Sequence, residues 1–115
     1  VLSANSTKTI KYVLEQKGLD SYITVLRRPA IFGKATSIKK LMRRNGYEGD
    51  RVWMIGDEVR DVQAAQKSKV KSIAVTWGLQ DRKILEQNNP TAIAITIKDI
   101  AQILKNGMIT RENKE

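Results

Sequence analysis

Ten consecutive residues decide the fold of this chain: Val52-Trp53-Met54-Ile55-Gly56-Asp57-Glu58-Val59-Arg60-Asp61. The first four are apolar and predict a short buried strand. Gly56 then turns the chain, and Asp57 stands where the N-cap of a helix would be. The stretch therefore predicts a strand, a tight turn and a helix in immediate succession.

The two aspartates of this stretch point to a cation site. Asp57 and Asp61 are four residues apart, so their carboxylates share one face of the first helical turn. They follow the carboxyl end of a strand, where open α/β sheets bind ligands. Mg²⁺ commonly takes one or two protein carboxylates and fills its shell with water and substrate oxygens. The alternative is that Asp57 only caps the helix and Asp61 is a solvated surface acid, and the stretch alone leaves both open.

Length and composition limit the class of protein. A chain of 115 residues can bury a single core, which indicates one domain. Hydrophobic residues make up 41% and charged residues 29%, as is typical of globular proteins. No apolar run approaches the ~18 residues of a membrane span, and no signal-peptide pattern is present. Because the sequence opens with Val1 inside an apolar run, we expect an N-terminal segment to be missing.

The residue types that are absent exclude several chemistries. Without cysteine the chain has no disulfide, no thiolate metal site and no Cys nucleophile. Without histidine it has no Ser-His triad and no His general base. Any chemistry falls to Asp, Glu, Lys, Ser and Thr. The absence of cysteine is compatible with a cytoplasmic location.

The formal net charge of +9 raises the question of nucleic-acid binding. The largest basic cluster lies on the face of a predicted helix opposite its apolar residues, and comprises Lys39, Lys40, Arg43 and Arg44. A solvated helix face explains this pattern. Aromatic residues make up 5% of the chain and none lies among the basic residues as a stacking platform would. We therefore do not expect a nucleic-acid or membrane partner.

Strand and helix patterns alternate along the chain. Apolar or β-branched runs predict strands at 1–4, 22–26, 52–55, 72–77 and 92–96. Apolar stripes with capping residues predict helices from 5–7 to Gly18 and at 35–45, 58–68, 80–87 and 97–105. Residues 1–105 are thus predicted to form the domain and 106–115 a frayed tail. The alternation and the continuous apolar strands predict an α/β fold, with a parallel sheet covered by helices on both faces.

Two further strand ends carry groups that suit a phosphate. Ser3, Asn5 and Ser6 follow the first strand, and a hydroxyl beside the free N–H groups of a helix N-terminus can bind an anion. Lys34 follows Gly33 at the start of the second helix and supplies a positive charge. Considered singly, each group is as well explained by capping or by ordinary surface charge.

In this order, the hydroxyl, lysine and paired acids resemble the sites of the haloacid dehalogenase (HAD) superfamily. The resemblance covers nearly the whole chain. Its second, third and fourth motifs are similar to Val1-Leu2-Ser3-Ala4-Asn5-Ser6, Phe32-Gly33-Lys34 and Gly56-Asp57-Glu58-Val59-Arg60-Asp61. The strand Ala74-Val75-Thr76-Trp77-Gly78 is also similar to phosphoglycolate-phosphatase-like members. The implied fold is a three-layer Rossmann-like HAD core.

One departure from the family pattern is as informative as the match. The family's first motif is a strand ending in Asp-x-Asp, which carries the nucleophile and the general acid/base. No Asp-x-Asp occurs in this sequence. The family places that strand upstream of Ser3, usually with a cap domain in between. The chain therefore resembles the second part of such an enzyme, a core that lacks its central first strand.

The resemblance implies Mg²⁺-dependent phosphoester hydrolysis through an aspartyl-phosphate, acting on a small phosphorylated substrate. Ser3 and Asn5 would bind the phosphoryl group, Lys34 would neutralise it, and Asp57 and Asp61 would bind Mg²⁺. The alternative, which the missing nucleophile favours, is a non-catalytic binding or interaction module, either a relic or half of a split assembly. This chain alone is expected to be inactive.

The missing strand implies a gap in the sheet. In the family it lies between the strand ending at Ser3 and the strand ending at Asp57. Each exposed edge would carry unpaired backbone groups, at ~1–3 kcal/mol for each buried one. We expect a missing N-terminal segment to fill the gap. The alternatives are that the two edges close on each other or that another chain inserts a strand.

Overall fold

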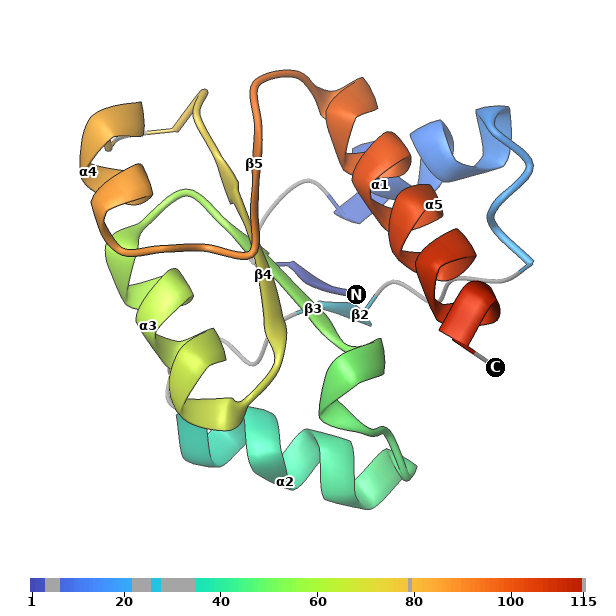
Figure 1. The fold of residues 1–115 in the computed structure, drawn as a ribbon, viewed down its shortest axis with the longest axis horizontal. Coiled ribbons are helices and arrows are strands. Elements are labelled where there is room, and N and C mark those ends of the chain that lie inside the picture. Colours follow the sequence, from blue (N-terminus) through green and yellow to red (C-terminus); the bar gives the residue numbers. More distant parts are fainter. Residues whose placement is uncertain (4–6, 22–25, 28–34, 79, 115) are drawn as a thin grey trace.

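The computed structural model describes residues 1–3, 7–21, 26–27, 35–78 and 80–114, and their backbone forms one parallel sheet (Figure 1). The strand order is β2-β1-β3-β4-β5, and every neighbouring pair is parallel. The strands are β1 (Leu2–Ser3), β2 (Leu26–Arg27), β3 (Trp53–Gly56), β4 (Lys71–Val75) and β5 (Ala92–Ala94). The predicted alternation of strands and helices is therefore confirmed.

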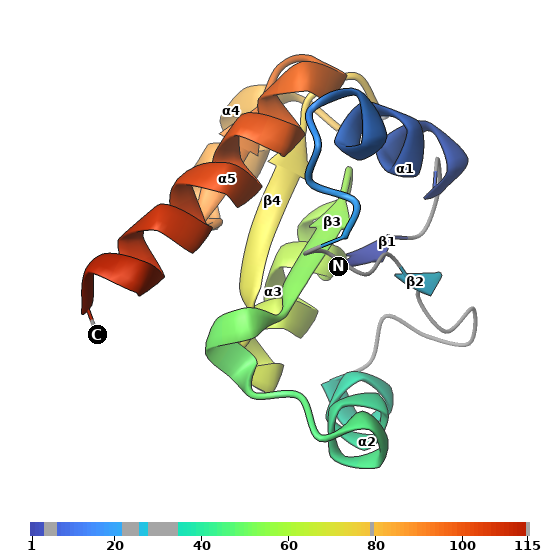
Figure 2. The same ribbon diagram turned by 90° about the vertical axis from the view of Figure 1, so that its right-hand side faces the viewer.

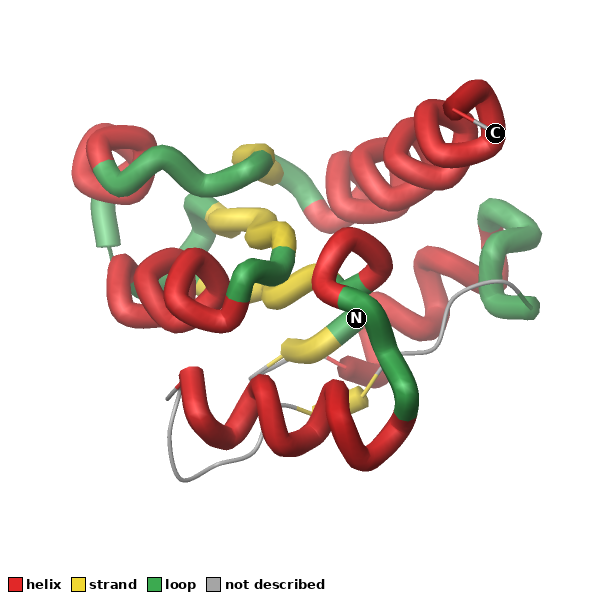
Figure 3. The backbone as a smooth tube through the Cα atoms, turned by 60° about the horizontal axis from the view of Figure 1, so that its bottom comes forward, coloured by secondary structure: helices red, strands yellow, loops and turns green. Residues whose placement is uncertain are grey.

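Helices cover both faces of this sheet (Figures 1 and 3). One face carries α1 (Thr7–Gln16) and α5 (Ile97–Lys114), and the other carries α2 (Ala35–Asn45), α3 (Val59–Ser68) and α4 (Arg82–Gln87). A short 3₁₀ helix, η1 (Gly49–Arg51), precedes β3. The result is the predicted three-layer α/β arrangement.

The side chains of the central strands alternate between two cores. Ile55 and Ile73 pack with residues of α1 and α5, whereas Met54 and Ala74 pack on the opposite face. All four are at most 3% exposed. Because neighbouring residues of a strand point to opposite faces, a strand buried on both sides needs a continuous apolar run.

The gap expected between the first and third strands is closed in this structure. β1 pairs directly with β3, with Leu2 opposite Met54 and Ser3 opposite Ile55, and Figure 2 shows the two side by side. In these 115 residues the structure shows one of the three expected outcomes, the two edges closing on each other. Direct pairing satisfies backbone groups that an open gap would leave without partners.

Several element ends differ from the sequence prediction. β4 ends at Val75 and β5 at Ala94, two residues earlier than predicted in each case. The carboxylate of Asp99 accepts hydrogen bonds from the backbone N–H groups of Ile95 and Thr96, which draws these residues into the cap of α5. In the second strand the described part is Leu26–Arg27, and predicted residues 22–25 lie outside the described residues.

The largest difference is at the C-terminal helix, since α5 continues to Lys114 where the sequence indicated an end near 105 and a frayed tail. Gly107 lies against the indole of Trp53, where a Cβ would approach ring carbon Cζ2 to 3.3 Å. A glycine, usually a weak point in a helix, here permits this close contact. Neither α5 nor any other helix in the described part of the chain is long and apolar enough to cross a membrane.

The predicted helix ends at two glycines are confirmed. Gly18 and Gly46 both have φ of +69°, the left-handed conformation that terminates a helix. The sequence pattern also predicts that Gln66 shares the apolar face of the helix at 58–68 with Val59, Val62 and Ala65, and this is wrong. Gln66 of α3 is exposed, and its amide donates to the backbone carbonyls of Asn88 and Asn89 at the end of α4.

Candidate functional site

The carboxyl ends of β1, β3 and β4 meet at one edge of the sheet. The parallel register sets Ser3 opposite Ile55, and Gly56 opposite Ala74. Asp57 follows Gly56 directly and therefore stands at this edge, between the ends of β1 and β4. This is the position at which open parallel sheets bind their ligands.

The Asp57 carboxylate is half-buried and makes no hydrogen bond or ion pair within the part of the chain that the structure describes. The loop after β4 packs closely against this carboxylate, because a Cβ added to Gly78 would overlap it. Glycine thus allows the loop to pack directly against this acid. The carboxylate keeps lone pairs that could bind a cation.

Asp61 lies in the first turn of α3 and contacts the turn that precedes this helix. Its side chain is only 3% exposed, so it is not a solvated surface acid. Its Oδ2 accepts a hydrogen bond of 3.2 Å from the backbone N–H of Glu58. A Cβ on Gly56 would overlap the same carboxylate, which shows how closely the end of β3 approaches it. Asp61 therefore stabilises the turn between β3 and α3 through this hydrogen bond.

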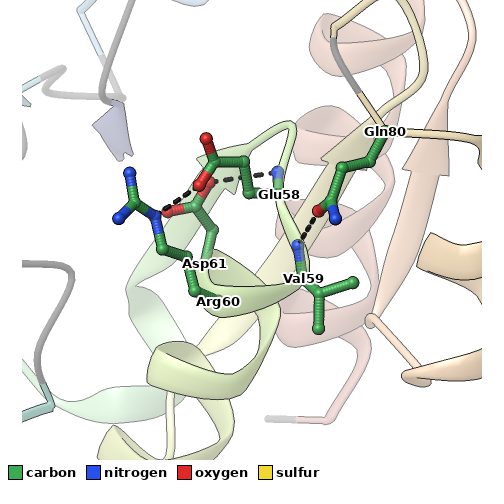
Figure 4. A network of polar contacts seen from close by, with 5 residues as sticks. All are labelled: Glu58, Val59, Arg60, Asp61 and Gln80. Atoms are coloured by element: carbon green, nitrogen blue, oxygen red, sulfur yellow. Dashed lines mark hydrogen bonds and ion pairs between the residues drawn. The ribbon is translucent and has the colours of Figure 1, made fainter.

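The helix cap is also shifted by one residue. The N-cap of α3 is Glu58, with extended backbone angles, and not Asp57 as the sequence predicted. The side chain of Glu58 forms an ion pair with Arg60 (Figure 4). Because Glu58 takes the cap position, the carboxylate of Asp57 is not needed at the helix start.

Gln80 is a site residue that sequence reasoning missed. Its Oε1 accepts a hydrogen bond of 2.5 Å from the backbone N–H of Val59, the first residue of α3 (Figure 4). The two residues are 21 apart in sequence and on different elements. Nothing in the local pattern around Gln80 indicates this contact, because it arises only when the loop after β4 folds over the start of α3.

Of the predicted phosphate-binding residues, the structure describes only Ser3. The backbone of Ser3 ends β1 at the same edge of the sheet as Asp57, as predicted. Asn5, Ser6 and Lys34 lie outside the described residues. The structure thus brings Asp57, Asp61 and the backbone of Ser3 to one edge.

The donors present fit a Mg²⁺ ion held by few protein ligands. Among the residues that the structure describes, no three acidic, His or Cys side chains gather where they could hold a metal. Mg²⁺ needs no such cage, because it keeps several waters and accepts one or two carboxylates. Asp57 can coordinate directly. Asp61, which is buried and already bonded to the backbone, suits a contact through water.

The sequence of this chain matches a known protein family. A family model described as "Haloacid dehalogenase-like hydrolase" matches residues 1–75. This chain therefore belongs to the haloacid dehalogenase-like hydrolase family.

Two curated relatives of the chain are phosphatases. The chain is 35% identical over 103 residues to a phosphoglycolate phosphatase of Synechococcus elongatus, covering 89% of this chain and 49% of that protein. It is 31% identical over 67 residues to a pyrophosphatase of Oceanobacillus iheyensis, covering 58% of this chain and 31% of that protein. The chain thus spans at most about half the length of these relatives.

Solved structures share the fold. A predicted phosphatase from Clostridium acetobutylicum matches 91% of this chain and 51% of its own, with a TM-score of 0.64 and 24% identity. A haloacid dehalogenase-like protein from Streptococcus pneumoniae matches 87% of this chain and 49% of its own, with a TM-score of 0.60 and 17% identity. These likenesses confirm the α/β fold class.

Proposed function

We propose that this chain is part of a Mg²⁺-dependent phosphatase that hydrolyses a small phosphorylated substrate. The observation that carries the proposal is the Asp57 carboxylate. It stands at the carboxyl end of β3 without a hydrogen-bonding or ionic partner in the described structure. Family membership and the phosphoglycolate phosphatase relative support the reaction class.

The residues of this chain would bind and orient the reacting groups. Asp57 would hold Mg²⁺ directly and Asp61 through water, while Asp61 keeps the turn in place through the Glu58 N–H. Ser3 and Asn5 would donate hydrogen bonds to phosphoryl oxygens, and Lys34 would neutralise their charge. When bound, Mg²⁺ would supply further neutralisation of the phosphate. Phosphoryl transfer depends mostly on such positioning and charge stabilisation.

The attacking carboxylate would come from outside these 115 residues. Covalent transfer requires a nucleophile, and the sequence contains no Asp-x-Asp. We propose that a strand carrying it, from an N-terminal segment or another chain, inserts between β1 and β3. Among the described residues the β1–β3 pairing involves two residue pairs, so little of this backbone pairing has to be exchanged.

Metal binding tests the site directly. We expect Mg²⁺ to bind the chain weakly, because two carboxylates leave most of its coordination shell to water. Asp57→Asn should abolish binding, as measured by titration with amide chemical shifts as the readout. Asp20→Asn, which removes the same charge from an exposed turn, is the matched control and should bind as the unmodified chain does. Binding that Asp57→Asn leaves unchanged would place the site elsewhere.

Turnover tests the missing nucleophile. Residues 1–115 alone should not hydrolyse para-nitrophenyl phosphate with Mg²⁺. Turnover that disappears in Asp57→Asn would reveal a nucleophile within this chain. The coding sequence upstream decides between the alternatives, since an Asp-x-Asp strand there supports a phosphatase and its absence supports a non-catalytic module.

A further inference from the structure

The loop after β4 contacts the turn that carries Asp57 at two points. Gly78 lies against the Asp57 carboxylate, and two residues later the Gln80 side chain bonds to the N–H of Val59. The turn from Gly56 to Val59 is therefore held from one side by Asp61 and from the other by this loop. Figure 4 shows both hydrogen bonds reaching the start of α3.

The chemistry of the Gln80 contact is well defined. The first N–H groups of a helix have no partner within the helix, so Val59 needs an acceptor from elsewhere. An amide side chain can meet a donor only through its oxygen, which assigns Oε1 to this contact. The bond therefore joins the loop after β4 to the start of α3.

We propose that Gln80 is a positioning residue for the cation site. This inference rests on the proposed function, because it assumes that Asp57 binds Mg²⁺. Gln80 does not contact the ion. It fixes the loop to the helix start, and this keeps Gly78 packed on the Asp57 carboxylate and limits the orientations that the carboxylate adopts.

A pair of glutamines provides a matched test. Gln80→Met keeps the length of the side chain and removes the acceptor, whereas Gln80→Glu keeps an acceptor oxygen. Gln66→Met is the control, because Gln66 also ties α3 to a distant backbone, through Asn88 and Asn89 at its opposite end. The two Met variants lose a side chain–backbone contact of the same kind, so a purely structural role predicts the same outcome for both.

The expected results separate positioning from general stability. Gln80→Met should weaken Mg²⁺ binding about tenfold, in the range seen when a residue that orients a metal ligand is removed. Gln80→Glu should bind Mg²⁺ at least as well as the unmodified chain. Gln66→Met should lower the unfolding temperature to a similar extent as Gln80→Met and leave Mg²⁺ binding unchanged.

A second readout needs no metal. Hydrogen exchange at the Val59 amide should accelerate in Gln80→Met and stay slow in Gln80→Glu and Gln66→Met. An unchanged Val59 amide in Gln80→Met would overturn the proposal. So would Mg²⁺ binding that Gln80→Met leaves intact while Asp57→Asn abolishes it, and the proposed function would then stand. Binding that is indifferent to Asp57→Asn would overturn both.

Discussion

The described strand pairing differs between the two halves of the sheet. On one side, β3 and β4 pair over four residues and β4 and β5 over three. On the other side, the described residues pair β1 with β2 and with β3 over two residues each. The first half carries Asp57 and Asp61, and the second carries Ser3. We call the side with Asp57 and Asp61 the metal half of the proposed site, and the side with Ser3 the phosphate half. The described strand pairing is more extensive in the metal half.

The comparison shows which part of the site is self-contained. The strand, turn, helix and loop that hold the acids all come from the continuous segment 53–80. The phosphate half joins segments that are farther apart, because Leu2 of β1 pairs with Met54 of β3, 52 residues later in the chain (54 − 2). Contacts within one segment close short loops, whereas distant ones carry a larger entropic cost. The acid half can therefore form independently of how the β1 edge is paired.

Hydrogen exchange gives the largest expected contrast. Amides of β4 should exchange only through global unfolding, whereas amides of β1 should exchange through local opening with a free energy several kcal/mol lower. The difference follows from the four residue pairs between β3 and β4 and the two described pairs between β1 and β3. Equal protection of β1 and β4 would show that the two halves open as one unit.

A core truncation tests the stability of the metal half. Ile73 of β4 is 1% exposed, and Ile73→Ala should lower the free energy of unfolding by about 2–5 kcal/mol. Ile84→Ala on α4 is the matched control, because Ile84 is 42% exposed and should cost much less. Chemical denaturation measures both. A cost at Ile73 as small as that at Ile84 would contradict the packing of β4 at the centre of the core.

A glycine substitution tests the turn itself. Gly56→Ala should destabilise the chain by about 1–3 kcal/mol and weaken Mg²⁺ binding, because the new methyl displaces the buried Asp61 carboxylate. Gly46→Ala meets open space and should cost about 1 kcal/mol through its left-handed backbone, without affecting Mg²⁺. If both variants bind Mg²⁺ alike, the contact between Gly56 and Asp61 does not shape the site.

Local patterns were sufficient to predict much of this fold. Continuous apolar runs indicated the buried strands, and glycines at 18 and 46 marked helix ends because their conformation requires it. Asp57 and Asp61 could be placed near the same strand end because a strand, a turn and a helix follow each other without interruption. Each of these features depends on residues close in sequence.

Features that depend on distant contacts could not be predicted. The Gln80–Val59 bond spans 21 residues, and Gly107 in the continuation of α5 lies against Trp53, 54 residues earlier (107 − 53). The N-cap falls on Glu58 instead of Asp57, and Glu58 forms a reciprocal capping box with Asp61. Pairing of β1 with β3 likewise depends on which strands are present to compete for an edge.

The smallest expected effect concerns the cap of α5, just after β5. Backbone N–H groups of Thr96 and Ile95 hold the pKa of Asp99 below its usual value of 3.8. A lowered pKa means that the folded state favours the ionised carboxylate. Its contribution to stability is therefore complete above about pH 4 and is lost as the pH falls through the lowered pKa.

Asp99→Asn tests this sign, because the amide oxygen can still accept a hydrogen bond but the side chain no longer titrates. The variant should unfold at a slightly lower temperature than the unmodified chain at neutral pH, and the difference should shrink as the pH falls below 4. Asp20→Asn, at an exposed turn, controls for the loss of one negative charge. Because α5 packs on the same core as β4, the effect should appear in the single cooperative transition. A difference that grows with acid would mean that Asp99 is held in its protonated form, contrary to its two backbone donors.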